Sequence, residues 1–151
     1  MKRIKMVVTV GLAGVILGAI LFGCSGSTTE DFLPNVTLSI NALIFEVPVD
    51  SFQIQTVTIK NLSTKNVTIE RITSTNDDVF RVGGYFTNNE LVELETPFAI
   101  EGNGARAIYI GFYPEEESEY QGKIVVESID INSNSETDLL DLTGTGLPDP
   151  D

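Results

Sequence analysis

Apolar and polar residues alternate with a period of two along most of the chain after residue 35, and helical periodicity is nearly absent. Such alternation predicts β-strands with one buried face, because successive side chains of a strand point to opposite faces. The predicted strands lie around residues 36–40, 43–49, 57–59, 67–69, 108–112, 120–126 and 140–142. Pro48 argues for an edge position for its strand, and Ile72, which breaks the phase, indicates a β-bulge.

Clusters of turn-forming residues separate these strands. They lie at residues 63–66, 75–78, 87–89, 102–104 and 132–135. About seven to nine short strands without a credible helix predict an all-β, immunoglobulin-like β-sandwich. The domain contains neither Trp nor Cys, so the Cys–Trp–Cys signature of antibody domains is absent. Two aromatic residues, Phe112 and Tyr120, are expected to point inward, with Tyr120 in a tyrosine corner whose hydroxyl bonds back to the backbone.

The first 24 residues have the pattern of an export signal. A basic start at Lys2, Arg3 and Lys5 precedes an apolar run over residues 6–22, a small residue and the only cysteine, Cys24. Residues 21–24, Leu-Phe-Gly-Cys, resemble the lipobox of bacterial lipoproteins. That resemblance implies cleavage before Cys24 and attachment of a diacylglycerol to its thiol. The alternative is an uncleaved membrane helix, for which residues 6–22 are at the short end of the spanning range.

These features predict the domain organisation. Residues 1–23 form a lipoprotein signal peptide, 24–35 a flexible tether, 36–147 the sandwich and 148–151 a disordered tail. The predicted location is a bacterial membrane, with the protein exported and held by lipid. Ser25 follows the cysteine, and the lipoprotein sorting pattern places aspartate there for the inner membrane, so the outer membrane is favoured.

The charge balance excludes one class of partner. Loss of residues 1–23 leaves six basic residues against all 22 acidic ones, a net charge of −16. Such a surface repels nucleic acid and anionic head groups. The acidity gives solubility and distance from the bilayer, or attracts cations or a basic partner.

Short motifs along residues 36–147 occur in the order that is typical of one family. The motifs are Leu43-Ile44-Phe45, Thr56-Val57-Thr58-Ile59-Lys60-Asn61, Asp77-Asp78 before Phe80, Ile110-Gly111-Phe112-Tyr113-Pro114, Tyr120-Gln121-Gly122-Lys123-Ile124 and Leu142-Thr143-Gly144-Thr145-Gly146. Together they resemble the ASH/Hydin-type Ig-like domain, a relative of the major sperm protein fold that occurs in exported "choice-of-anchor D" proteins. Glu46 and Asp50 depart from its usual glycines. The resemblance implies a binding or scaffolding module with no catalytic residues.

The residue inventory disfavours an enzyme. The chain has no histidine, and Cys24 is assigned to lipid, which removes the usual general base and thiolate nucleophile. The densest carboxylates, Glu115-Glu116-Glu117 and Glu119, follow Pro114 in a predicted loop, where solvated charges are the simpler interpretation. No catalytic residue and no cofactor are predicted.

One segment has an EF-hand-like spacing of oxygen ligands. The calcium candidates are Asp130, Asn132, Asn134, Glu136 and Asp141, with Asp138 beside them. Ser135 stands where the sharp turn needs glycine, and Asp141 stands where a bidentate glutamate is expected. A hairpin loop between the last two strands is the favoured interpretation, and no metal site is predicted.

We therefore expect a lipid-anchored envelope protein that acts as a non-enzymatic binding or structural module. Its partners are the membrane, through Cys24, and a protein of unknown identity. The alternative is a calcium- or carbohydrate-dependent surface adhesin. An exposed aromatic platform, built from Tyr85, Phe86, Tyr109 or Tyr113, would favour sugar binding, whereas a bare sheet edge would favour a protein partner through strand addition.

Overall fold

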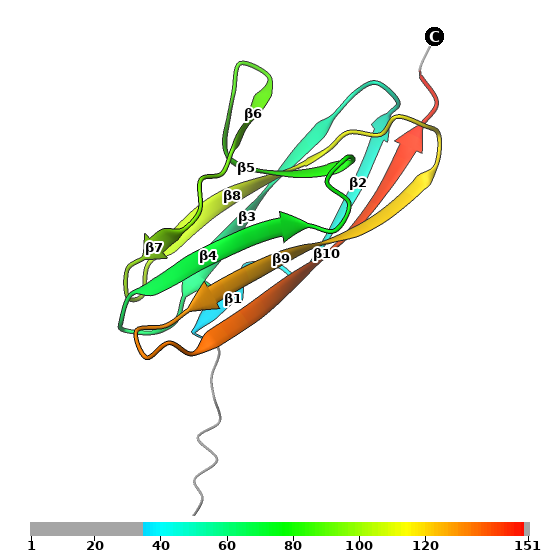
Figure 1. The fold of residues 1–151 in the computed structure, drawn as a ribbon. Helices are drawn as coiled ribbons and strands as arrows, with labels where there is room; N and C mark the ends of the chain where they lie inside the picture. Colours follow the sequence, from blue (N-terminus) through cyan, green and yellow to red (C-terminus); the bar gives the residue numbers. More distant parts are fainter. Residues whose placement is uncertain (1–34, 150–151) are drawn as a thin grey trace, which may run out of the picture. The chain divides into compact units, whose positions relative to one another are not determined.

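A computed structural model describes residues 35–149, which fold into ten strands in two five-stranded sheets (Figure 1). Sheet A has the order β1 (Val36–Leu38), β3 (Gln53–Asn61), β8 (Ala105–Phe112), β5 (Phe80–Thr87) and β6 (Glu90–Glu93). Sheet B has the order β2 (Ala42–Pro48), β10 (Ser135–Leu147), β9 (Glu119–Ile129), β4 (Val67–Ser74) and β7 (Phe98–Ile100). The predicted signal peptide, Cys24 and nearly all of the predicted tether lie outside the described residues and stay predictions.

The all-β sandwich is confirmed, and the strand count is ten rather than seven to nine. Three strands, β5, β6 and β7, are missing from the prediction. β5 contains Gly83-Gly84 and a register shift between Gly83 and Tyr85, which interrupt its alternation. β6 and β7 are too short to show a clear alternation. Pro48 belongs to β2 at an edge of sheet B, as expected. The expected bulge in β4 is also present, as a register shift between Ile69 and Arg71. All strand pairs are antiparallel except β2 with β10.

Three phenylalanines form the centre of the core. Phe45, Phe80 and Phe112 are fully buried, and their ring centroids lie 5.1–5.9 Å apart. Phe45 comes from sheet B and the other two come from sheet A, so the rings join the two layers. Gly144 of β10 faces the Phe112 ring so closely that a Cβ atom at this position would overlap it.

Tyr120 adds a fourth ring at the beginning of β9. Its ring meets Phe112 edge-on at 5.6 Å. Its hydroxyl accepts a hydrogen bond from the Glu116 N–H at 2.9 Å and donates one to the Glu116 carbonyl at 3.2 Å. The predicted tyrosine corner is therefore confirmed, and it fixes the connection from sheet A to sheet B between β8 and β9.

One inward-facing position of β10 carries a carboxyl group. Asp138 continues the alternation of the buried residues Leu140 and Leu142, and its Oδ2 atom is buried without a hydrogen-bond partner in the described chain. Burial, and then the charge of Glu136, raise the pKa of Asp138 to about 6. The ionised carboxylate is therefore a local cost to the fold at neutral pH.

We predict strong coupling between Phe112 and Gly144. Phe112→Ala should lower the free energy of unfolding by about 3–5 kcal/mol, because it leaves a cavity between the sheets. Gly144→Ala should cost about 1–3 kcal/mol through overpacking, but much less when Phe112 is already alanine, since the methyl group then enters the cavity. Urea denaturation of the wild type, the two single variants and the double variant completes a double-mutant cycle. Additive costs would show that the two residues do not touch.

We also predict that Asp138→Asn stabilises the domain in a pH-dependent manner. A carboxyl with a raised pKa binds its proton more tightly in the folded state, so stability falls as pH rises from about 4 to about 6. The variant should therefore gain on the order of 1–2 kcal/mol at pH 7.5, after allowance for solvent screening, and almost nothing at pH 4. Asp141→Asn, on the exposed face of the same strand, is the control. An equal gain at both pH values would contradict the buried-charge account.

Candidate binding surface

A group of aromatic side chains lies on the outer face of sheet A. Phe52, Phe86 and Tyr113, together with Arg81, are called the outer aromatic cluster here. Phe52 stacks on Tyr113 with ring centroids 5.6 Å apart and meets Phe86 at 5.9 Å. Phe52 has 39% of its surface exposed, while Phe86 and Tyr113 are half-buried. The cluster is thus partly packed and partly open to solvent.

Strand register brings these residues together. Gln53 of β3 pairs with Phe112 of β8, so the residues that follow outward from this pair, Phe52 and Tyr113, become neighbours. Arg81 of β5 pairs with Gly111 of β8, which brings the arginine to the same place from the other side. The cluster therefore depends on three strands that lie side by side in sheet A.

A glycine lets Tyr113 lie flat on the sheet. A Cβ atom at Gly111 would stand 2.6 Å from Cε2 of Tyr113 and 2.9 Å from Cδ1 of Ile54. The tyrosine ring therefore covers the backbone of Gly111, beside Ile54. A similar arrangement occurs on β5, where a Cβ atom at Gly83 would overlap the side chain of Leu91. Both glycines make room for a large side chain that lies along the sheet.

The cluster contains one positive charge held against a ring. The Arg81 guanidinium lies 4.8 Å from the centroid of the Tyr113 ring, within the range of a cation–π interaction. Burial raises the pKa of Tyr113, and the charge of Arg81 opposes that rise. The phenol therefore stays neutral at physiological pH. The site combines apolar rings, a phenol hydroxyl and a guanidinium, and it holds no nucleophile or base.

The structure brings together only part of the predicted aromatic platform. Phe86 and Tyr113 join through Phe52, which is not one of the predicted platform residues. Tyr85 pairs with Val92 on the opposite face of the β5–β6 hairpin from Phe86, and it is 54% exposed. Tyr109 of β8 pairs with Gly83 of β5, away from Phe52. Only the pairing of β3 with β8, which sequence alternation does not specify, could have identified Phe52.

Three of the calcium candidates share one loop, whereas Glu136 and Asp141 lie elsewhere. Asp130 accepts hydrogen bonds from the backbone N–H groups of Asn132 and Asn134, both at 2.8 Å, and from the Asn134 side chain at 2.9 Å. These bonds, chiefly from Asn134, hold the pKa of Asp130 below its ordinary value. Glu136 accepts from the N–H groups of Asn35 and Val36. The segment is a hairpin loop, as expected, in which Ser133 has a φ of 67°.

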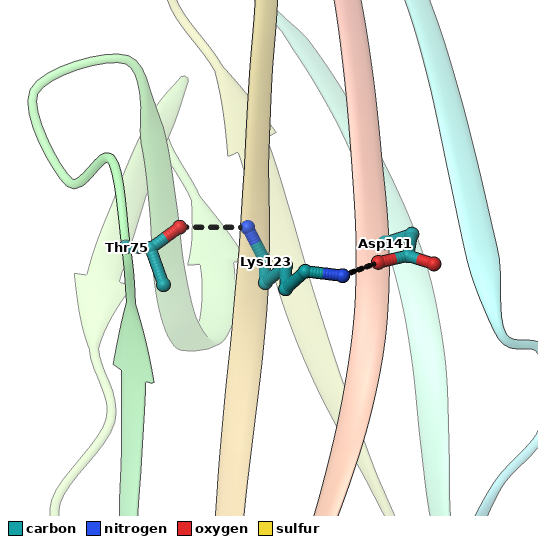
Figure 2. A network of polar contacts seen from close by, with 3 residues as sticks. All are labelled: Thr75, Lys123 and Asp141. Carbon is teal, nitrogen blue, oxygen red and sulfur yellow. Dashed lines mark hydrogen bonds and ion pairs between the residues drawn. The ribbon is translucent and has the colours of Figure 1, made fainter.

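The last candidate, Asp141, lies on the outer face of sheet B. Its carboxylate forms an ion pair with Lys123 of β9, whose backbone N–H donates to Oγ1 of Thr75 at 2.9 Å (Figure 2). These residues border a shallow hollow of about 580 Å³ that Gln121 and Thr143 also line. The pair is solvent-exposed, so its contribution to stability is small. The hollow has one cation and one carboxylate, already paired with each other.

The acidic run after β8 is also without a shielded carboxyl. Glu115, Glu116 and Glu117 are all exposed, and the backbone of Glu116 serves the tyrosine corner. Within residues 35–149, no group of three His, Cys, Asp or Glu side chains is arranged to hold a metal ion. In the same residues there is no helix of the length and hydrophobicity needed to cross a membrane.

No protein-family model matches the chain, and no curated protein matches it either. Solved structures share its fold. The ASH/PapD-like domain 7 of human CEP192 is 15% identical, with a TM-score of 0.58 over 77% of this chain and 87% of that one. WR4, a major sperm protein family member of Caenorhabditis elegans, is 12% identical, with a TM-score of 0.50 over 74% of this chain and 97% of that one.

The periplasmic chaperone SfaE is similar at 16% identity, with a TM-score of 0.51 over 76% of this chain and 59% of the chaperone. At these identities the likeness concerns the fold. It agrees with the resemblance that the motifs along residues 36–147 indicate. Residues 35–149 therefore have the Ig-like fold shared by ASH, PapD-like and major sperm protein domains.

Proposed function

We propose that the protein is a lipid-anchored module of a bacterial envelope that binds another protein through the outer aromatic cluster and catalyses no reaction. The observation that carries the proposal is the cluster itself, with Phe52 exposed and Arg81 stacked on Tyr113. Tyrosine, phenylalanine and arginine are enriched at the centres of protein–protein interfaces. Packing on the sheet holds these side chains in place, which lowers the entropy lost on binding.

The ring orientations favour a protein over a sugar. Stacking on a sugar needs an open, flat ring face, but Phe52 and Phe86 are inclined at 59° to each other. Tyr113 has Gly111 beneath it, and Phe52 and Arg81 stack on it. An uneven surface of inclined rings suits the interdigitating side chains of a protein partner.

The charges around the cluster support the same conclusion. Alternation along the strands of sheet A leaves Lys60, Arg81 and Glu93 as the charged residues on its outer face. Small or uncharged side chains, such as Thr56, Thr58 and Ala107, cover the rest of β3 and β8. In a chain with a net charge of −13, the small number of charged residues on this face keeps the desolvation cost of docking low.

The anchor is tested by mass and by substitution. We expect the protein to partition with membranes and its intact mass to exceed that of residues 24–151 by the attached acyl groups. Two or more acyl chains hold stably, since each buried methylene contributes ~0.8 kcal/mol. Cys24→Ser should release or misprocess the protein. An unmodified chain of residues 24–151 in the soluble fraction would contradict lipidation.

The cluster is tested by substitution in the native cell. Phe52→Ala and Tyr113→Ala should each reduce proximity labelling of the bound protein about tenfold or more, as expected for central interface residues. Phe52→Ala should cost the fold only about 0.5–1.5 kcal/mol, because the ring is partly exposed. Leu139→Ala, at an exposed apolar position on the outer face of sheet B, is the matched control. Equal labelling by all three variants would exclude the outer aromatic cluster as the interface.

The adhesin alternative predicts other results. Calorimetric titration of the protein with calcium would then show stoichiometric binding tighter than ~10⁻⁴ M that Asp130→Ala abolishes. A carbohydrate-dependent adhesin would lose glycan binding in Tyr113→Ala. Either result, with proximity labelling unaffected by the cluster variants, would replace the proposal of protein binding.

A further inference from the structure

The edge of β4 is only partly covered. β7 pairs with Val67, Thr68 and Ile69 at the beginning of β4 and extends no further. Figure 1 shows this short strand beside the first part of β4. From Glu70 to Ser74, the side of β4 that faces away from β9 has no strand partner among residues 35–149.

Hydrogen-bonding groups of β4 are directed to this free side. Thr75 donates its N–H to the Lys123 carbonyl of β9, and the register continues through Thr73 opposite Val125. Because backbone groups alternate in an antiparallel ladder, those of Thr73 face β9 and those of Ile72 and Ser74 face away from it. The N–H and C=O of Ile72 are therefore available to a further strand.

The other end of sheet B is protected against strand addition. Its edge strand β2 contains Pro48, and two glutamine side chains of β3 occupy its backbone groups. The Glu46 N–H donates to Gln53 Oε1 at 3.3 Å, and Gln55 Nε2 donates to the Ile44 carbonyl at 2.7 Å. Natural sheets cover or block their edges in such ways to avoid unwanted pairing. The end of sheet B at β4 has no such side-chain caps among the hydrogen bonds of the described residues.

A cleft of about 340 Å³ lies along the uncovered part of β4. Its walls come from both sheets, with Ile72 on β4 and Phe80 and Val82 on β5, and Leu94 closes one side. Ile72, Val82 and Leu94 are only partly buried and pack against the core. The cleft thus offers apolar contacts beside a free strand edge, which is the combination that strand addition uses for affinity and for side-chain selection.

The free charges at the cleft are acidic. Asp77 and Glu93 line it, and Asp78 follows Asp77 in the loop between β4 and β5. The single lining cation, Arg81, is directed over the Tyr113 ring and donates to the Asp78 carbonyl at 3.4 Å. Lysine or arginine next to an inserted strand would therefore find carboxylates, whereas acidic residues would be repelled.

We propose that the edge of β4 from Glu70 to Ser74 accepts an extended segment of a partner protein as an added strand. The segment has apolar residues at alternate positions, which enter the cleft, and basic residues at its ends, which meet Asp77, Asp78 and Glu93. Arg81 borders both this surface and the outer aromatic cluster, but the edge of β4 takes no part in that cluster. The inference therefore does not depend on the function proposed for the cluster.

The probe is the labelled peptide acetyl-Lys-Val-Thr-Val-Thr-Val-Lys-amide, with acetyl-Glu-Val-Thr-Val-Thr-Val-Glu-amide as its acidic counterpart. Binding to the full chain in detergent is followed by fluorescence anisotropy. The basic peptide should bind at least ten times more tightly than the acidic one, and Asp77→Lys should reduce that preference. Residue-resolved hydrogen exchange should show slower exchange of the Ile72 amide on binding, while the Thr73 amide, already bonded to β9, stays unchanged.

Two substitutions at one position isolate the backbone bond. Ile72→Ala removes the side chain and keeps the N–H group, whereas Ile72→Pro also removes the N–H, which the fold itself does not use. The proline variant should bind the basic peptide about tenfold more weakly than the alanine variant. Phe52→Ala should leave peptide binding unchanged, which separates this edge from the outer aromatic cluster.

Three results would overturn the inference. These are no binding of the basic peptide at a concentration of ~1 mM, binding without protection of the Ile72 amide, and equal binding by the alanine and proline variants. The exchange measurement uses the unaltered chain, so it decides the question even where Ile72→Pro does not fold.

Discussion

The packing of Phe45, Phe80 and Phe112 between the two sheets is the constraint on which the rest of the structure depends. With rings 5.1–5.9 Å apart, these side chains set the spacing of the layers. The fit against Phe112 leaves no room for a side chain at Gly144. The chain has no tryptophan, and its one cysteine lies outside the domain, so the centre of the core is built from phenylalanine. Loss of one ring would open a cavity that the others could not fill.

The same packing determines the outer face. Because successive residues of a strand point to opposite sides, burial of Phe112 directs Gly111 outward, and the Tyr113 ring comes to lie over that glycine. Burial of Phe80 directs Arg81 outward in the same way, next to the Tyr113 ring. The outer aromatic cluster is therefore coupled to the core by alternation. A shift of one residue in the β5–β8 register would exchange the side chains that face the core with those that face outward.

Much of the fold could be predicted from the sequence because alternation and turn residues are local signals. Pro48 and the phase break at Ile72 correctly indicated an edge strand and a bulge. Tyr120 correctly indicated a tyrosine corner. The strands β5, β6 and β7 were not predicted. The alternation of β5 is interrupted by Gly83-Gly84 and a register shift, β6 shows no alternation, and β7 is only three residues long.

The candidate surfaces were less predictable because they depend on contacts between distant parts of the chain. Phe52 and Tyr113 meet only through the pairing of β3 with β8. The free edge of β4 exists only because β7 is short. Local alternation specifies neither the partner of a strand nor where a pairing stops. The possibility of a bare edge could be stated from the sequence, but its place could not.

The central claim is that the outer face of sheet A binds a protein. Photo-crosslinking in the native cell tests it most directly, with a photoreactive phenylalanine analogue placed at Phe52 and, for comparison, at Ile44, which is 70% exposed on the outer face of sheet B. The account predicts one discrete protein adduct from position 52, lost when Tyr113 is replaced by alanine, and no such adduct from position 44. The same adducts from both positions, or none from position 52, would contradict it.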